Sequence, residues 1–454
     1  MTKLSNGCPE ILGKIPRRPR LAQSVTTPPI PLKTAFMTED QASPATDAAA
    51  PPHIHWLEAD QACSALWRSE RGGLPPKRVV LADDTLSADS AYRLACAGTG
   101  MLWRGDFQNA RLLLKAIARR IDQVPKRKRV KAAQPVPITE AFNLHRQAQA
   151  QRARTLGMLL VELDASYHMA LRRAPDVSLA CSEAWGDADP TAGASVVSLR
   201  ELMGVTSAHE WRRVGVEIAA LGEAPGNRIH PHYGVFSPVR GEYIGLVATA
   251  HLPKAPKGQT SITAFDIGTG TGVLAAVLVH RGVSHVVATE FEHRALLCAQ
   301  DNVARLGLAQ HITVLQADLF PPGQASLIVC NPPWLPARPS SPLERAVYDE
   351  GGHMLKGFLA GLSSHLAPGG EGWLILSNLA ELLGLRTRDD LLAAFAQHGL
   401  RVVSRIDAKP QHPKAGDVSD ALHQARAKEV TSLWRLAVQK PDPAASHAHE
   451  AAAD

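Results

Sequence analysis

The chain has 454 residues, of which 45% are hydrophobic and 20% are charged, and its formal net charge is +6. This length predicts two or three domains, and the composition is that of an ordinary globular protein. No apolar run approaches the roughly 20 residues that cross a membrane, no export signal precedes a cleavage site, and the six cysteines form no Cys-x-x-Cys pair, so we expect a cytoplasmic protein with no membrane or metal partner.

The first 225 residues divide into two predicted regions. Residues 1–52 are rich in Pro, Ala, Thr and Ser, which predicts a disordered leader; an organellar transit peptide and a translation start at Met37 are alternatives. Residues 53–225 are predicted to form a separate, mainly helical N-terminal domain that recognises the substrate. Its helices are predicted over 111–121 and 155–172, where leucines recur at helical spacing.

Positive charge concentrates in one segment of that domain, residues 111–154. The segment contains twelve Lys and Arg residues and only two acids, and at its centre is the run Lys126, Arg127, Lys128 and Arg129. Such a block suits a polyanion, because each neutralised phosphate releases counterions. We therefore predict that this run contacts a nucleic-acid substrate, with RNA favoured; a solvated linker between two domains is the alternative.

From residue 261 onward, strands and helices alternate regularly. Alternation of this kind gives a parallel sheet with helices on both faces. We therefore predict an α/β domain over 226–440 with a doubly wound, mostly parallel, seven-stranded sheet. Its last strand has no helix before it and is predicted to return antiparallel, and the tail, 441–454, is predicted to be disordered. Strands are predicted over 261–267, 285–290, 312–317, 326–330, 372–377, 400–406 and 431–438, and helices over 273–281, 293–306, 349–366 and 389–398.

A glycine-rich loop and three acids mark the carboxyl edge of this predicted sheet. The loop Gly268-Thr269-Gly270-Thr271-Gly272 follows the first strand, where glycines allow a sharp turn and the close approach of a ligand. A dinucleotide-binding fingerprint would need its third glycine at Val273, so the spacing favours a different cofactor, S-adenosyl-L-methionine. We predict that Asp266 offsets the positive charge of that cofactor, that Glu290 accepts from its ribose hydroxyls, and that Asp318 accepts from its adenine amino group.

The fourth strand of the sheet runs directly into Asn331-Pro332-Pro333-Trp334. Two prolines fix two φ angles and remove two N–H donors, which leaves carbonyl oxygens at the strand end without partners. The side-chain carbonyl of Asn331 and the backbone carbonyl of Pro332 then form two acceptors that match an NH₂ group. Trp334, together with Pro333, offers a flat surface to a planar substrate. We predict Asn331, Pro332 and Trp334 as catalytic residues, with Asn331 also contacting the cofactor.

The stretch from Asp266 to Trp334 resembles the class I S-adenosylmethionine-dependent methyltransferases, and in particular the amino-methylating subset with an Asn/Asp-Pro-Pro-aromatic motif. That subset includes adenine methyltransferases of DNA and RNA and the release-factor glutamine methyltransferases. The resemblance covers about residues 233–438 and implies a Rossmann-like fold, S-adenosyl-L-methionine as cofactor and methylation of an amino nitrogen. The fourth motif position is usually Tyr or Phe, whereas here it is Trp334, and residues 236–240 match the proline-rich loop of the glutamine enzymes only loosely.

Three functions are compatible with these residues. The first is an amino-methyltransferase acting on a base in RNA or DNA, which the basic segment favours. The second is a protein glutamine methyltransferase, because the motif is shared. The third is a nucleic-acid-binding protein with an inactive methyltransferase fold, against which the intact glycines, acids and motif argue. His230 and His232 have no ligand partner nearby in the sequence and are interpreted as loop or surface residues.

Overall fold

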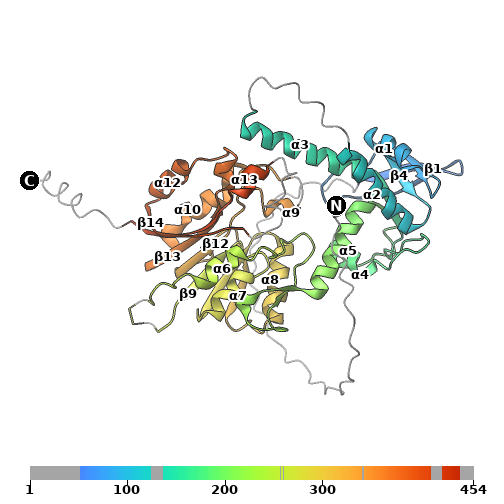
Figure 1. The fold of residues 1–454 in the computed structure, drawn as a ribbon. Helices are drawn as coiled ribbons and strands as arrows, with labels where there is room; N and C mark the ends of the chain where they lie inside the picture. The colour runs from blue at the N-terminus through green and yellow to red at the C-terminus, as the bar shows by residue number, and fades with distance from the viewer. Residues whose placement is uncertain are drawn as a thin grey trace, which may run out of the picture. The chain divides into compact units, whose positions relative to one another are not determined.

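The computed structural model describes residues 52–123, 136–255, 257–258, 260–339, 342–410 and 422–439. The predicted leader up to residue 51, the predicted tail and the run Lys126, Arg127, Lys128 and Arg129 lie outside these residues. Two large sheets organise the described chain, one on each side of residue 230 in the sequence (Figure 1). Within the described ranges, no helix is both long enough and apolar enough to span a membrane.

The N-terminal region is built on a six-stranded mixed sheet, so the prediction of a mainly helical domain is wrong. The strand order is β1-β2-β6-β5-β4-β3, with the β1–β2 and β5–β6 pairs antiparallel and the other pairs parallel. The strands are β1 (His53–Glu58), β2 (Gln61–Arg68), β3 (Arg78–Ala82), β4 (Thr99–Trp103), β5 (Leu159–Leu163) and β6 (Ser195–Ser198). The helices are α1 (Ala88–Cys96), α2 (Phe107–Gln123), α3 (Ile138–Leu156), α4 (Ser178–Trp185) and α5 (Leu199–Val214).

The helical prediction failed because the central strands are short and buried on both faces. All residues of β4 and all but one of β5 are buried, and such runs lack the alternation that distinguishes a strand from a buried helix. The leucines that suggested one helix over 155–172 belong to two elements, since α3 ends at Leu156 and β5 begins at Leu159. The predicted helix over 111–121 is confirmed within α2.

A connector links the two sheets and carries little regular structure. It contains β7 (Val216–Glu217), the 3-10 turn η1 (Ala219–Leu221), β8 (Arg228–Ile229) and helix α6 (Glu242–Thr249). Ile229 and most of α6 are buried against the C-terminal sheet. The connector is therefore packed onto the second sheet along much of its length.

The C-terminal sheet has seven strands in the order β11-β10-β9-β12-β13-β15-β14. β15 pairs antiparallel with both of its neighbours, and the other pairs are parallel. This confirms the predicted mostly parallel sheet with an antiparallel last strand. The strands are β9 (Thr263–Ile267), β10 (His285–Glu290), β11 (Ile312–Gln316), β12 (Ala325–Cys330), β13 (Leu366–Ser377), β14 (Leu400–Ala408) and β15 (Thr431–Val438).

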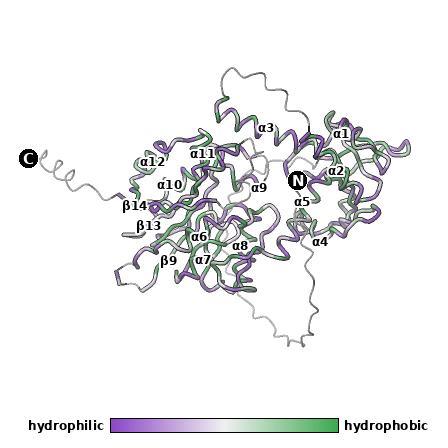
Figure 2. Tube along the Cα trace, in the orientation of Figure 1, coloured by the Kyte–Doolittle hydropathy of each residue, from purple (hydrophilic) through white to green (hydrophobic). Residues whose placement is uncertain are grey.

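Helices cover both faces of this sheet, and each face has its own apolar core. Residues of α6 and α7 form one core with the sheet, and residues of α10 and α12 form the other. Hydrophobic positions recur along the strands and helices of this region (Figure 2). The helices are α7 (Val273–His280), α8 (His293–Arg305), α9 (Pro342–Arg345), α10 (His353–His365), α11 (Leu379–Leu382), α12 (Arg388–Gln397) and α13 (His423–Ala427), with the 3-10 turn η2 (Glu350–Gly352) before α10.

Candidate active site

The glycine loop between β9 and α7 is held by a buried carboxylate. Gly268, Gly270 and Gly272 all have positive φ angles, which a side chain would disfavour. Asp266 is 1% exposed, and its Oδ2 accepts hydrogen bonds from the Thr269 hydroxyl at 2.6 Å and from the Ala275 N–H at 3.0 Å. Burial raises the pKa of Asp266 to about 6. The carboxylate therefore joins the loop to the first turn of α7.

Glu290 ends β10, and its carboxylate contacts the same loop from this neighbouring strand. Its Oε2 accepts from the Gly270 N–H at 2.9 Å, and its Oε1 accepts from the Phe291 N–H at 3.0 Å. Burial raises the pKa of Glu290 above its usual value. Asp318, the third predicted acid, is exposed and lies two residues beyond the end of β11. All three acids line one cavity.

The Asn-Pro-Pro-Trp motif follows β12 and contains a hydrogen bond of its own. The Trp334 Nε1–H donates to the Asn331 Oδ1 at 2.9 Å. This bond fixes the orientation of the Asn331 amide, because only its carbonyl oxygen can accept from an indole N–H. An oxygen that already accepts one hydrogen bond keeps a second lone pair, so a substrate N–H can still bind there.

Trp334 is covered on one ring face by Arg240. The Arg240 guanidinium lies over the indole, 5.3 Å from the ring centre, and forms ion pairs with Glu242 at 2.7 Å and Glu429 at 3.3 Å. Glu429 in turn accepts from the Ser377 hydroxyl. Sequence reasoning noted the segment that ends at Arg240 but missed this contact, because the ion-pair partners lie up to 189 residues apart.

One cavity of about 1520 Å³ joins the loop, the acids and the motif. It exceeds the roughly 300–1,000 Å³ of a typical small-molecule pocket, so it has room for a cofactor and an acceptor group side by side. The structure brings nearly all of the predicted cofactor and motif residues together here; Gly272 is not among the lining residues and immediately precedes α7. The predicted residues that line the cavity are Asp266, Gly268, Thr269, Gly270, Thr271, Glu290, Asp318, Asn331, Pro332, Pro333 and Trp334.

Comparison with known proteins agrees with this geometry. Residues 226–385 match the family model of the methyltransferase small domain. This region is a class I S-adenosylmethionine-dependent methyltransferase domain. The relatives that this domain matches are named for two kinds of substrate, protein and tRNA.

The similar proteins include enzymes named for protein and for tRNA substrates. The chain is 33% identical over 137 residues to the release factor glutamine methyltransferase of Cereibacter sphaeroides, covering 27% of this chain and 49% of that protein. It is 27% identical over 227 residues to the tRNA1(Val) (adenine(37)-N6)-methyltransferase of Shewanella loihica, covering 46% of this chain and 88% of that protein. A solved ribosomal protein L11 methylase from Lactobacillus delbrueckii subsp. bulgaricus is 19% identical, with a TM-score of 0.28, and covers 40% of this chain and 73% of that chain. The chain thus spans about half the length of the release-factor relative.

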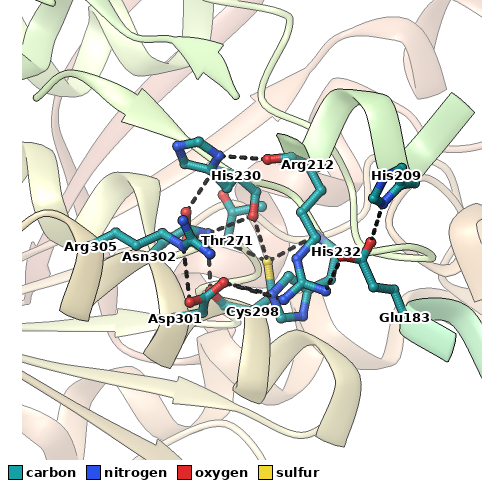
Figure 3. A network of polar contacts seen from close by, with 10 residues as sticks. All are labelled: Glu183, His209, Arg212, His230, His232, Thr271, Cys298, Asp301, Asn302 and Arg305. Carbon is teal, nitrogen blue, oxygen red and sulfur yellow. Dashed lines mark hydrogen bonds and ion pairs between the residues drawn. The ribbon is translucent and has the colours of Figure 1, made fainter. Parts of the chain in front are cut away.

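A buried asparagine ties the glycine loop of the methyltransferase domain to the connector (Figure 3). Asn302 of α8 is 1% exposed. Its Nδ2 donates to the carbonyls of Thr271 and His230, both at 3.2 Å, and its Oδ1 accepts from the His230 N–H at 2.7 Å. The position of the connector and that of the glycine loop are therefore fixed by the same side chain.

The polar network extends from α8 to two N-terminal helices (Figure 3). Asp301 accepts from the His232 Nε2 at 3.1 Å and lies 3.5 Å from the Arg212 guanidinium. Arg212 also pairs with Glu183 of α4, which contacts His209 of α5 at 2.9 Å. His232 lies in a loop, as interpreted, but its side chain is only 12% exposed and is held by Asp301. Nothing in the local sequence signals these contacts, because they join distant segments.

Part of the predicted basic segment is engaged in ion pairs. Among its described residues, Arg120 pairs with Asp89 at 2.6 Å, Arg152 with Asp122 at 3.0 Å and Arg146 with Glu344 at 3.6 Å. These pairs reduce the positive charge that the described part of the segment presents. The predicted contact run, Lys126, Arg127, Lys128 and Arg129, lies outside the described residues.

The described residues also bear on metal binding. No group of three or more His, Cys, Asp or Glu side chains within the described ranges is arranged to hold a metal ion.

Proposed function

We propose that this protein transfers a methyl group from S-adenosyl-L-methionine to an amino nitrogen of a planar substrate, a base in RNA being favoured. The observation that carries the proposal is the joining of three strand-end acids, the glycine loop and the Asn-Pro-Pro-Trp motif in one cavity. The match to the methyltransferase small domain supports the same chemistry.

The glycine loop fits the proposed cofactor. A Cβ placed on Gly270 would meet no atom within 4 Å, and Gly270 lines the cavity, so the loop leaves open space for a ligand. Glu290 offers carboxylate oxygens to the ribose hydroxyls, and Asp266 places negative charge beneath the loop. When bound, the cofactor supplies an electrophilic methyl group on a positively charged sulfur.

The motif acts on the acceptor nitrogen. A ring amine or a carboxamide is a poor nucleophile, because its lone pair is delocalised. Hydrogen bonds from its NH₂ group to the Asn331 Oδ1 and the Pro332 carbonyl favour a pyramidal nitrogen, so they strengthen as the new bond forms and lower the barrier. The cavity also aligns the nitrogen with the methyl group. No general base is needed, because the methylated nitrogen becomes acidic and loses its proton afterwards.

Two other functions are kept as alternatives. A protein glutamine methyltransferase would use the same two acceptors, and the 33% identity to a release factor glutamine methyltransferase supports it. An inactive nucleic-acid-binding protein would keep the fold without binding the cofactor. Calorimetric titration with S-adenosyl-L-methionine separates the inactive protein from both enzymes, because only the enzymes release heat on binding.

The acceptor is tested with methyl-labelled cofactor and separate RNA, DNA and protein fractions from cells. We expect label in RNA. Label on protein glutamine would favour the alternative enzyme, and cofactor binding with no label in any fraction would contradict the proposed transfer.

The nucleic-acid role of the basic run is tested by binding labelled RNA across a salt series. Replacing Lys126, Arg127, Lys128 and Arg129 with Ala should flatten the salt dependence by about 0.7–0.9 units of logarithmic slope per lost phosphate contact. A control variant replaces Lys254 and Lys257, two exposed bases that precede β9, with Ala. Equal slopes for the parent and the quadruple variant would remove the nucleic-acid role of this run.

A further inference from the structure

Helix α3 of the N-terminal region contacts the acceptor side of the active site. We define the acceptor wall as residues 335–339, which directly follow Trp334 in the chain, together with residues 344–349. Most of these residues line the cavity. Two backbone hydrogen bonds join the halves of the wall, from the Leu335 N–H to the Val347 carbonyl at 3.1 Å and from the Asp349 N–H to the Leu335 carbonyl at 2.9 Å. A shift of the wall therefore moves the residue next to Trp334.

The first half of α3 is anchored in the methyltransferase domain. Phe142 is 2% exposed and lies in an apolar cluster with Leu335, Leu379 and Leu383. The Thr139 hydroxyl donates to the Leu383 carbonyl at 3.1 Å. This end of the helix thus has an apolar contact and a polar contact with the same domain.

Arg146, one turn further along α3, contacts both halves of the wall. Its Nη2 donates to the Arg338 carbonyl at 2.6 Å, and the same nitrogen lies 3.6 Å from the Glu344 carboxylate. Its guanidinium lies 4.3 Å from the centre of the Tyr348 ring. A planar guanidinium combines these three contacts, whereas a lysine ammonium has neither the fork of donors nor the flat face.

The other end of α3 belongs to the N-terminal sheet region. Leu156 is 4% exposed in the core of that region, and Arg152 pairs with Asp122 of α2. Residues 147–151 between the two ends are exposed. A helix that is exposed in its middle and anchored at both ends bridges two regions of the chain.

We propose that Arg146 is a positioning residue of the acceptor site. From the N-terminal region it holds the acceptor wall in place, and through Leu335 it fixes the position of Trp334. The proposal rests on the proposed function, since it concerns the acceptor half of the transferase. Although Arg146 belongs to the basic segment, its charge is used in contacts within the protein and not in phosphate binding.

The test is hydrogen exchange of the wall amides in the full chain, which needs no acceptor. Arg146→Ala should make the amides of Leu335 and Asp349 exchange about tenfold faster or more, because a hydrogen bond from a charged donor and a ring contact are lost. Arg146→Lys should show most of this increase. The control is Arg154→Ala, on the same helix, where the arginine is exposed and contacts Gln151 of its own helix.

Cofactor affinity and turnover complete the test. The dissociation constant for S-adenosyl-L-methionine should stay within about twofold of the parent in all three variants, while turnover on the labelled fraction falls about tenfold in the two Arg146 variants only. The proposal would be overturned if the amides of the acceptor wall exchanged at the same rate in Arg146→Ala and in Arg154→Ala. It would also be overturned if amides throughout β9 and β12 exchanged faster in Arg146→Ala. If Arg146→Ala does not fold, the exchange rates of the wall amides in Arg146→Lys decide the role of Arg146. A parent that methylates no fraction contradicts the proposed function, while the exchange result still decides the role of Arg146.

Discussion

The two sides of the cavity are built in different ways. The cofactor side is made of residues close together in sequence, because the glycine loop, Asp266 and Glu290 all lie within β9, β10 and the turns that follow them. The acceptor side is assembled from distant segments, namely Arg146 of α3, Arg240 of the connector and Glu429 before β15. The cofactor side thus follows from a local motif, whereas the acceptor side depends on the whole fold.

This difference indicates that the acceptor side can change its geometry more readily than the cofactor side. A loop held by its own strand-end carboxylates keeps its geometry wherever the sheet forms. A wall held by residues from another region changes when that region changes. The comparison predicts that variants on the cofactor side change cofactor affinity, and that variants on the acceptor side change turnover.

The largest expected effect is on the acceptor side. Asn331→Ala should lower turnover by about 10²–10³, as for the loss of a hydrogen-bond partner in the transition state, with cofactor affinity almost unchanged. Trp334→Phe, which keeps an aromatic ring but removes the N–H that orients Asn331, should cost less than Asn331→Ala. Steady-state rates and calorimetry measure both quantities. Turnover of Asn331→Ala within about threefold of the parent would refute the role of the amide.

The next effect is on the cofactor side. Glu290→Ala should weaken binding of S-adenosyl-L-methionine by about 1–3 kcal/mol, because a charge-assisted contact to the ribose is lost. It also removes the acceptor of the Gly270 N–H. Glu290→Gln keeps one carbonyl oxygen and should lose less. Unchanged affinity in a folded Glu290→Ala variant, measured by calorimetry, would rule out this role.

Cofactor affinity should also depend on pH. Burial raises the pKa of Asp266 to about 6 and raises that of Glu290. The deprotonated carboxylates favour a cationic ligand, so affinity should be constant above these pKa values and fall as the pH decreases through about 6, by up to roughly tenfold per unit for each group. Asp266→Asn should flatten this decrease. The same affinity at about pH 5.5 and about pH 7.5 would contradict the prediction.

The smallest effect tests the support of the glycine loop. Asn302→Asp removes the donor to the Thr271 carbonyl and should weaken cofactor binding about threefold to tenfold. The matched control is Asn227→Asp, since Asn227 is equally buried but donates to Gly222 within the connector. Both variants should lower the melting temperature, but only Asn302→Asp should change the affinity. Equal affinities in the two variants would mean that Asn302 supports the fold alone.

The sequence was informative where function depends on neighbours along the chain. Asp266, Glu290 and the motif could be placed because strand ends and glycine turns have local signatures, and the mostly parallel character of the C-terminal sheet follows from the alternation of elements. The N-terminal strands were missed because β4 and β5 are buried on both faces. The stacking of Arg240 on Trp334 and the contacts of His232 were missed because they require the folded chain.

The docking of α3 has a consequence for the modularity of this protein. A fragment starting at residue 226 would contain every proposed cofactor residue and all seven strands of its sheet. It would lack Phe142, so the part of the apolar surface of Leu335, Leu379 and Leu383 that Phe142 covers would face water. Exposed patches of this kind promote self-association. We therefore expect that the methyltransferase region, excised or fused elsewhere, stays monomeric only if it carries α3 with it.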